Sequence, residues 1–98
     1  MASYEYELED ELDLDEPKKY KVILLNDDFS TMDFVIEVLT KVFRKSQSES
    51  ETIMLNIHNK GREVCGIYTQ EIALTKVGQV KTMARKAKFP LKAIAQEE

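Results

Sequence analysis

Hydrophobic positions change their period several times along the chain, and each change marks an expected element. Residues 20–25, Tyr-Lys-Val-Ile-Leu-Leu, are rich in strand-forming side chains and stop at an Asn-Asp-Asp run that favours a turn. We therefore expect a first strand there. Apolar residues then recur at helical spacing over 31–43, preceded by a capping-box pattern of Ser30 and Asp33. This region is expected to form the first helix.

The polar stretch 44–47 interrupts the helical pattern before it resumes. Ser48 and Glu51 form a second capping-box pattern, and apolar residues at helical spacing follow them. Gly61 stands where a left-handed cap would end this second helix, because glycine adopts positive φ without steric cost.

The remaining residues predict a strand, a helix and a short last strand. Residues 64–68 favour the strand, and Thr69 can cap the third helix. Pro90 stops that helix, and residues 91–95 are extended again. The third helix is expected to bury one stripe of small and branched side chains: Ala73, Val77, Val80 and Ala84.

The element order β-α-α-β-α-β predicts an α+β fold, an α/β sandwich with a small three-stranded antiparallel sheet and helices packed on one face. A sheet of only three strands is too small to have both faces covered, so we expect the helices on one face. The 98 residues are 43% hydrophobic and 33% charged, which suffices for one modest core. We expect one core domain over residues 20–98.

Charge is divided unevenly along the chain, although the total is only −4. Residues 1–17 hold eight acids and no base, a net charge of −8, whereas the rest holds 14 bases and 10 acids, a net charge of +4. Repulsion at this density disfavours a compact state, so residues 1–19 are expected to form a flexible, disordered acidic extension. Tyr4, Tyr6 and Leu8 alternate with acids, which also allows a transient or partner-bound extended form.

Composition excludes several functional classes. The first residues lack a basic stretch followed by an apolar run, and no segment approaches the ~18 apolar residues of a membrane span, so we expect a cytoplasmic protein without membrane contact. Scattered bases without an aromatic-studded stripe argue against nucleic acid. The lone Cys65 lies in an apolar run and is expected to be a core thiol.

Two polar groups at the ends of regular elements are candidates for chemistry: the Asn26-Asp27-Asp28 run and His58. Met54 lies four residues before His58 on the same helix, so an apolar surface ends in a polar ring. The run is also a common turn, and a single histidine is often structural. A hydrolase would need Ser30 as nucleophile, although its helix-cap role explains it better, and a single His makes a metal site weak.

The run 20–35, Tyr-Lys-Val-Ile-Leu-Leu-Asn-Asp-Asp-Phe-Ser-Thr-Met-Asp-Phe-Val, resembles the opening signature of the ClpS family of protease adaptors. Later blocks continue the resemblance in the same order and spacing, and the match extends over about residues 20–93. These blocks are 54–58, Gly61, 64–69, Glu71, 75–77 and Pro90 with Leu91.

The resemblance implies a non-catalytic adaptor without cofactor or metal, which captures N-degron proteins, those with a free bulky N-terminal Phe, Tyr, Trp or Leu. Asn26, Asp27 and His58 would hold the α-amino group. A Clp AAA+ unfoldase, ClpA or alternatively ClpC, would be the partner, docked through its N-terminal domain on Glu71 and Lys76. The resemblance places a larger set around the substrate side chain: Leu25, Asp28, Ser30, Met32, Val35, Met54, Ile57 and Leu91.

Overall fold

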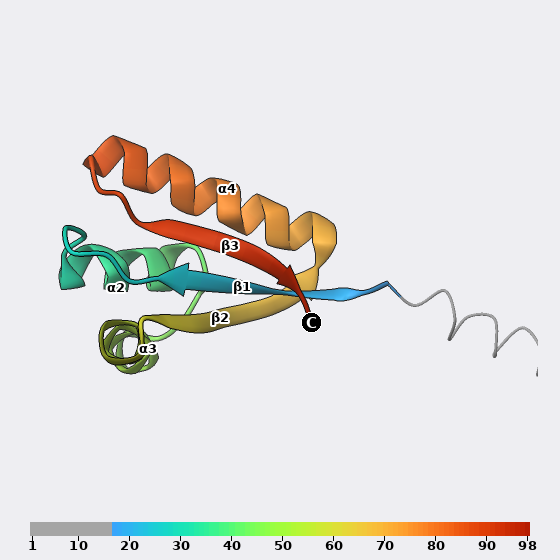
Figure 1. Ribbon diagram of the computed structural model, residues 1–98, viewed down its shortest axis with the longest axis horizontal. Helices are drawn as coiled ribbons and strands as arrows, with labels where there is room; N and C mark the ends of the chain where they lie inside the picture. The colour runs from blue at the N-terminus through green and yellow to red at the C-terminus, as the bar shows by residue number, and fades with distance from the viewer. Residues whose placement is uncertain (1–16) are drawn as a thin grey trace, which may run out of the picture.

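The computed structural model describes residues 17–98, in which strands and helices follow one another in the predicted order (Figure 1). The expected acidic extension over 1–19 lies outside the described residues as far as residue 16. The elements are β1 (Lys19–Leu25), α2 (Met32–Lys41), α3 (Gln47–Lys60), β2 (Arg62–Thr69), α4 (Gln70–Ala87) and β3 (Lys92–Glu97).

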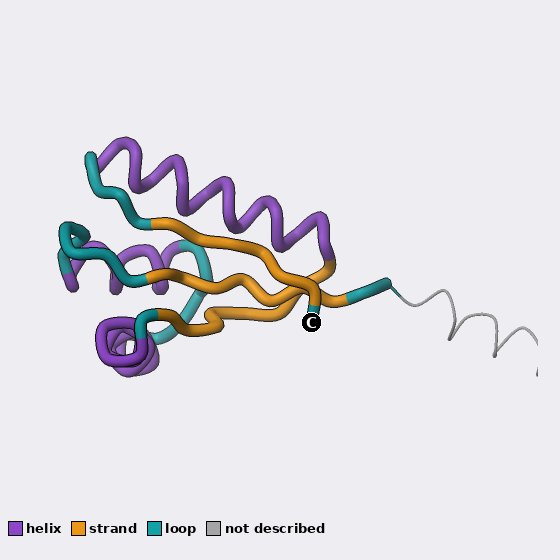
Figure 2. Tube along the Cα trace, viewed as in Figure 1, coloured by secondary structure: helices purple, strands orange, loops and turns teal. Residues whose placement is uncertain are grey.

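The three strands form one antiparallel sheet in the order β2-β1-β3, so β1 is the central strand (Figure 2). Tyr20, near the start of β1, faces Tyr68 of β2 and Glu97 of β3. Leu25, its last residue, faces Arg62 and Lys92. The turn that follows Leu25 therefore lies at the end of the sheet where β2 and β3 begin.

A single apolar core fills the space between the sheet and its helices. Val22 and Leu24 of β1 are completely buried, because alternate residues of a strand point to the same face. All three helices contribute side chains to this cluster, which confirms the predicted α+β sandwich. The buried members from the helices are Phe34, Val35, Val38, Leu39, Met54, Ile57, Ala73, Val80 and Ala84.

The first helix begins one residue later than predicted and ends two residues earlier, at Lys41. Its N-cap is Thr31, whose hydroxyl accepts the Phe34 N–H at 3.1 Å, so the predicted Ser30 cap is wrong. Ser30 is drawn away because its hydroxyl donates to the carboxylate of Asp27 at 2.8 Å. Adjacent Ser and Thr residues are equivalent in a capping pattern, and the hydrogen bond to Asp27 within the same loop separates them.

The second capping box is formed by Ser46 and Glu49, two residues before the predicted pair Ser48 and Glu51. The Ser-x-x-Glu pattern occurs twice, offset by two residues. The first copy forms the cap, so the helix is two residues longer at its start than predicted. The predicted left-handed cap at Gly61 is confirmed, with φ of 91°.

The last elements follow the prediction with small shifts of their ends. Thr69 occupies the N-cap of α4, although its side chain forms no capping hydrogen bond. The helix ends at Ala87 with Lys88 in the left-handed conformation, just before Phe89 and Pro90. Strand β3 runs from Lys92 to Glu97, later than the predicted 91–95, because the Glu98 N–H still bonds to the Lys19 carbonyl at 2.8 Å.

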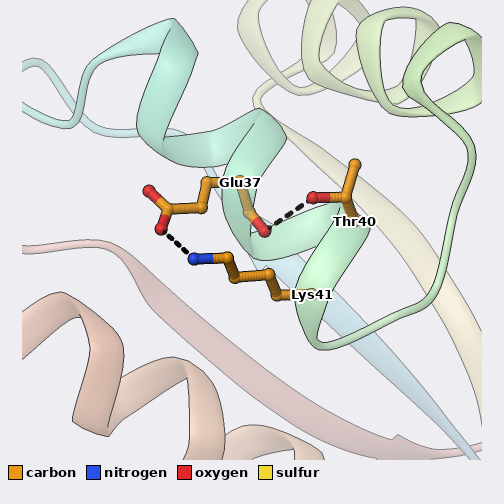
Figure 3. Close-up of polar contacts among 3 residues, drawn as sticks. All are labelled: Glu37, Thr40 and Lys41. Carbon is orange, nitrogen blue, oxygen red and sulfur yellow. Dashed lines mark hydrogen bonds and ion pairs between the residues drawn. The ribbon is translucent and has the colours of Figure 1, made fainter.

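The outer side of α2 is polar. Lys41 Nζ lies 2.7 Å from Glu37 Oε2, and the Thr40 hydroxyl donates to the Glu37 carbonyl at 3.0 Å (Figure 3). An exposed pair at this i,i+4 spacing contributes only about 0.3–0.5 kcal/mol, so the packing of the opposite, buried face decides the position of α2. Within residues 17–98 no helix is long and apolar enough to cross a membrane.

Two glycines offer a matched test of this backbone. Gly61→Ala should destabilise the protein by ~1 kcal/mol or more, because a Cβ is strained at positive φ. Gly78→Ala should stabilise it by ~0.5–1 kcal/mol, since Gly78 lies inside α4 with open space where the Cβ would stand. Urea unfolding at constant m-value measures both. Changes of the same sign in both variants would contradict the assigned backbone conformations.

Candidate functional site

The loop between β1 and α2 meets the end of α3 through a backbone hydrogen bond. The Asn26 N–H donates to the Gly61 carbonyl at 2.9 Å, and the Gly61 N–H donates in turn to the Ile57 carbonyl at 2.9 Å. Residues 26 and 27 are thereby held beside the last turn of α3, where His58 is exposed. The two polar groups that the sequence singles out lie together at this junction.

Asp27 organises the loop through three hydrogen bonds to its carboxylate. Oδ1 accepts the N–H of Phe29 at 2.8 Å and that of Ser30 at 2.6 Å, and Oδ2 accepts the Ser30 hydroxyl at 2.8 Å. A carboxylate offers about four lone-pair positions, so one remains for a further donor. The Ser30 hydroxyl donates to Asp27, so Ser30 does not form the serine-to-histidine hydrogen bond of a hydrolase triad in this structure.

The pKa of Asp27 reflects two opposing effects. Partial burial raises the pKa of the carboxyl, but the hydrogen bonds from the Ser30 N–H, the Phe29 N–H and the Ser30 hydroxyl outweigh burial and hold it below its usual value of 3.8. The carboxylate is therefore ionised at neutral pH and gives the junction one fixed negative charge.

A cavity of about 470 Å³ opens beside this loop and is lined by α2, α3 and the loop itself. Its apolar wall combines three buried side chains with Met32, which is half exposed at the first position of α2. The buried three are Val35, Met54 and Ile57. Its polar rim consists of Asn26, Asp27, Asp28, Ser30, Thr31 and His58.

Nine of the predicted site residues thus line one cavity, and Thr31 lines it as well. In the sequence, Thr31 stands beside Ser30 at the expected start of a helix. That position indicates a role in capping the helix and does not indicate that Thr31 also lines the cavity. Leu25 and Leu91 are not brought to the cavity. Leu25 borders a neighbouring hollow with Phe29 and Pro90, and Leu91 is buried between α4 and β3.

The predicted docking residues lie elsewhere, on the first turns of α4. Glu71 is exposed in the first turn, where a carboxylate favours the helix N-terminus. Lys76 donates from Nζ to the Val42 carbonyl at 2.7 Å, and Nζ lies 5.6 Å from the centre of the Tyr68 ring. Its ammonium therefore already joins α4 to the end of α2.

Cys65 is a core thiol, as its sequence context predicts. It is buried and free, and burial raises its pKa to about 12. Among residues 17–98 no cluster of three or more His, Cys, Asp or Glu side chains could hold a metal ion.

The fold and this cavity define a small α+β domain whose candidate site joins an apolar recess to a rim of hydrogen-bond acceptors. Comparison with known proteins makes the class specific. Residues 15–94 match the family described as ATP-dependent Clp protease adaptor protein ClpS. The match covers most of the chain and both halves of the site.

Individual relatives agree with this match. The ClpS adapter protein of Wolinella succinogenes is 52% identical over 96 residues, which cover 98% of this chain and 94% of that protein. The Campylobacter jejuni protein of the same name is 55% identical over 85 residues, 87% of this chain and 88% of its own. Agrobacterium tumefaciens ClpS2 bound to L-phenylalaninamide has a TM-score of 0.82 and 37% identity, covering 85% of this chain and 100% of that one. The chain belongs to the ClpS family of Clp protease adaptors.

The loop carboxylate gives a pH-dependent prediction. A depressed pKa in the folded state contributes stability that is present above the unfolded pKa and lost as pH falls through the folded value. Asp27→Asn should therefore be less stable than the parent at pH 7, and the difference should shrink as pH falls below 3.8. Urea midpoints measured across this range test it, with Asp28→Asn as a control that leaves the three hydrogen bonds intact. A difference that is independent of pH would contradict the role of the charge.

Proposed function

We propose that the cavity binds the N-terminal residue of a protein whose α-amino group is free and whose first side chain is bulky and apolar. The observation that carries this proposal is the placement of Asn26, Asp27 and His58 on the rim of one cavity with an apolar wall. The structural neighbour from Agrobacterium tumefaciens supports it, since the ligand bound to that protein, L-phenylalaninamide, has both a free amine and a bulky side chain.

The chemistry of the rim suits an ammonium group. An ammonium has three N–H donors and no acceptor, so it needs acceptors around it. The Asn26 side-chain oxygen, the remaining lone pair of Asp27 and a neutral ring nitrogen of His58 provide three. Asp27 also supplies the opposite charge, and its loop hydrogen bonds fix that charge before a ligand arrives.

Neither half of the site binds strongly alone. Hydrogen bonds to a charged group contribute about 1.5–3 kcal/mol each, and burial of a Phe or Leu side chain contributes about 1.5–3 kcal/mol. At the upper end of these values, about 12 kcal/mol for three hydrogen bonds and one buried side chain, an association cost of about 4 kcal/mol leaves on the order of −8 kcal/mol, a micromolar affinity. Because both halves are needed, the site selects proteins whose N-terminal residue has both a free amino group and a bulky side chain.

The captured protein is then delivered to a Clp AAA+ unfoldase for degradation, and this adaptor performs no catalysis of its own. Membership of the ClpS family of Clp protease adaptors supports this part. We propose the N-terminal domain of a ClpA-type or ClpC-type unfoldase as the partner, with Glu71 and the α4 turn around Lys76 as its docking surface. The Lys76 ammonium retains two N–H donors beyond its bond to Val42.

Loss of one acceptor should weaken binding without unfolding the domain. His58→Ala is expected to cost at least ~1.5 kcal/mol in affinity for a peptide that begins with Phe, because the ammonium loses a partner in a partly dry site. His58 is exposed and outside the core, so stability should be unchanged. Calorimetric titration measures the loss. Asn59→Ala is the matched control, since Asn59 is the exposed neighbour of His58 on α3 and does not line the cavity, and equal losses in both variants would refute the ammonium contact.

Met32 is expected to restrict the cavity mouth to side chains that are unbranched at Cβ. It is 51% exposed, begins α2 and lines the cavity, so its flexible side chain can lie against the first atoms of a ligand side chain. Met32→Ala should therefore raise binding of peptides beginning with Ile or Val relative to Leu. Titrations of the three peptides measure this ratio, and an unchanged ratio would show that Met32 does not select.

Deletion of residues 1–17 should separate capture from delivery. The segment contains none of the cavity residues, so peptide affinity should be nearly unchanged. Delivery should be lost, because an unfoldase acts on flexible chain segments and a tethered acidic tail presents one beside the docked substrate. A degradation assay beside peptide titrations measures both steps. Equal degradation rates with the full and truncated chains would show that the tail acts only as a solubility segment.

A further inference from the structure

A second cavity, separate from the one on the α2–α3 side, lies between the C-terminal half of α4 and β3, which run side by side in Figure 1. Its volume is about 450 Å³. Buried Ala84 and Leu91 form the floor together with half-buried Val77, Phe89 and Ala93. This groove therefore presents an apolar surface that the described residues leave uncovered.

The rim of the groove is purely cationic. Lys81 and Arg85 stand on the α4 side and Lys92 on the β3 side, all three are exposed, and no Asp or Glu lines the groove. The two ion pairs found in residues 17–98 join Lys18 to Glu97 and Lys41 to Glu37. The three groove cations therefore have no carboxylate partner within the part of the chain that the structure describes.

Strand β3 adds a third feature, because it is an edge strand of the sheet. One side of its backbone has no neighbouring strand among residues 17–98, and an extended segment can add to such an edge through main-chain hydrogen bonds. A suitable ligand is thus extended, acidic and apolar at alternate positions.

The chain itself contains a segment of that chemistry. Residues 4–15 alternate tyrosine or leucine with acids, except that Asp10 occupies one of the apolar positions, and they hold seven of the eight acids that precede Pro17. Alternation with period two places apolar side chains on one face of an extended segment and carboxylates on the other. We propose that residues 4–15 dock reversibly in the α4–β3 groove of the same molecule, with apolar side chains on its floor and carboxylates at Lys81, Arg85 and Lys92.

The lengths permit this docking. Tyr20 is opposite Glu97 and Leu25 is opposite Lys92, so Lys92 lies five residues along β1, or ~17 Å, from the point where the tail joins the sheet. Sixteen extended residues span up to ~50 Å. A reversal near Pro17 therefore leaves enough chain to follow β3 and fill the groove. The docking is independent of peptide capture, because the two cavities share no lining residue.

Paramagnetic relaxation in the full-length protein tests the proposal. Ser3→Cys supplies a single site for a nitroxide, since Cys65 is buried and its pKa of about 12 keeps it protonated. At low ionic strength the label should broaden the amide signals of Leu91 to Ile94 and of the facing residues of α4, while signals at the start of α3 stay sharp. Salt should restore the broadened signals because the rim contacts are exposed ion pairs.

Charge variants of the labelled protein make the test specific. K81E/R85E should abolish the broadening, and K81Q/R85Q should reduce it if the reversed pair fails to fold. K60E/R62E changes the net charge equally at the junction of α3 and β2, outside the groove, and should leave the broadening intact. Equal loss in both charge-reversed proteins, or broadening spread evenly over the surface, would overturn the proposal.

Two further samples define the occupant. Replacing Tyr4, Tyr6 and Leu8 together by Ser keeps every acid and should still release the tail, because the groove floor is apolar. Unchanged broadening in that variant would show a purely electrostatic contact and overturn docking in the groove. Labelled, NMR-silent protein mixed with unlabelled, isotopically enriched protein should give no broadening, and broadening there would assign the groove to the tail of a second copy.

Discussion

The hydrogen bond from the Asn26 N–H to the Gly61 carbonyl, 2.9 Å long, joins the two halves of the candidate site. It continues the pairing of β1 with β2 by one step beyond Leu25 and Arg62, so the register of the sheet fixes the loop against the end of α3. The carbonyl points there only because Gly61 has φ of 91°, a conformation that costs other residues free energy. The rim combines residues 26 and 27 with residue 58, which lies 31 positions after residue 27. Its geometry therefore depends on one backbone contact and one glycine.

Asp27 shows how the same loop combines stability with recognition. Its three internal hydrogen bonds lower its pKa, fix the direction of its carboxylate and leave one lone pair free. A charge that is already oriented loses little conformational entropy when an ammonium arrives, so more of the hydrogen-bond energy remains as affinity. The apolar wall is fixed in the same way, because Val35, Met54 and Ile57 belong to the core that holds α2 and α3 together. The proposed capture of an N-terminal residue at this site therefore needs little rearrangement of the domain.

Much of this arrangement could be predicted from the sequence, and the errors have local physical causes. Strong signals fixed the element order: the strand-forming run before Asn26, the helical spacing after it and the cap at Gly61. The choices between Ser30 and Thr31 and between Ser46 and Ser48 failed because neighbouring residues carry equivalent capping patterns, and the pattern does not reveal which of the competing local hydrogen bonds forms. Nine of the residues that the resemblance implies line one cavity. Leu25, the last residue of β1, and Leu91, which precedes β3, line other hollows, and their sequence positions do not reveal which way their side chains point. Lys81 and Arg85 are i,i+4 neighbours on α4, but the groove itself could not be predicted, because Lys92 and the apolar floor join them only when α4 packs on β3.

The central claim is that the cavity recognises a free α-amino group together with a bulky side chain. The most direct measurement is a pair of titrations of the full-length protein with a short peptide beginning in Phe and with its N-acetylated counterpart, followed by amide chemical shifts. The account predicts that the free peptide binds with micromolar affinity and shifts the signals of residues 26–32 and 54–58, and that acetylation removes most of the binding because an amide nitrogen offers a single uncharged donor. Equal affinity for both peptides, or shifts confined to other parts of the domain, would contradict it.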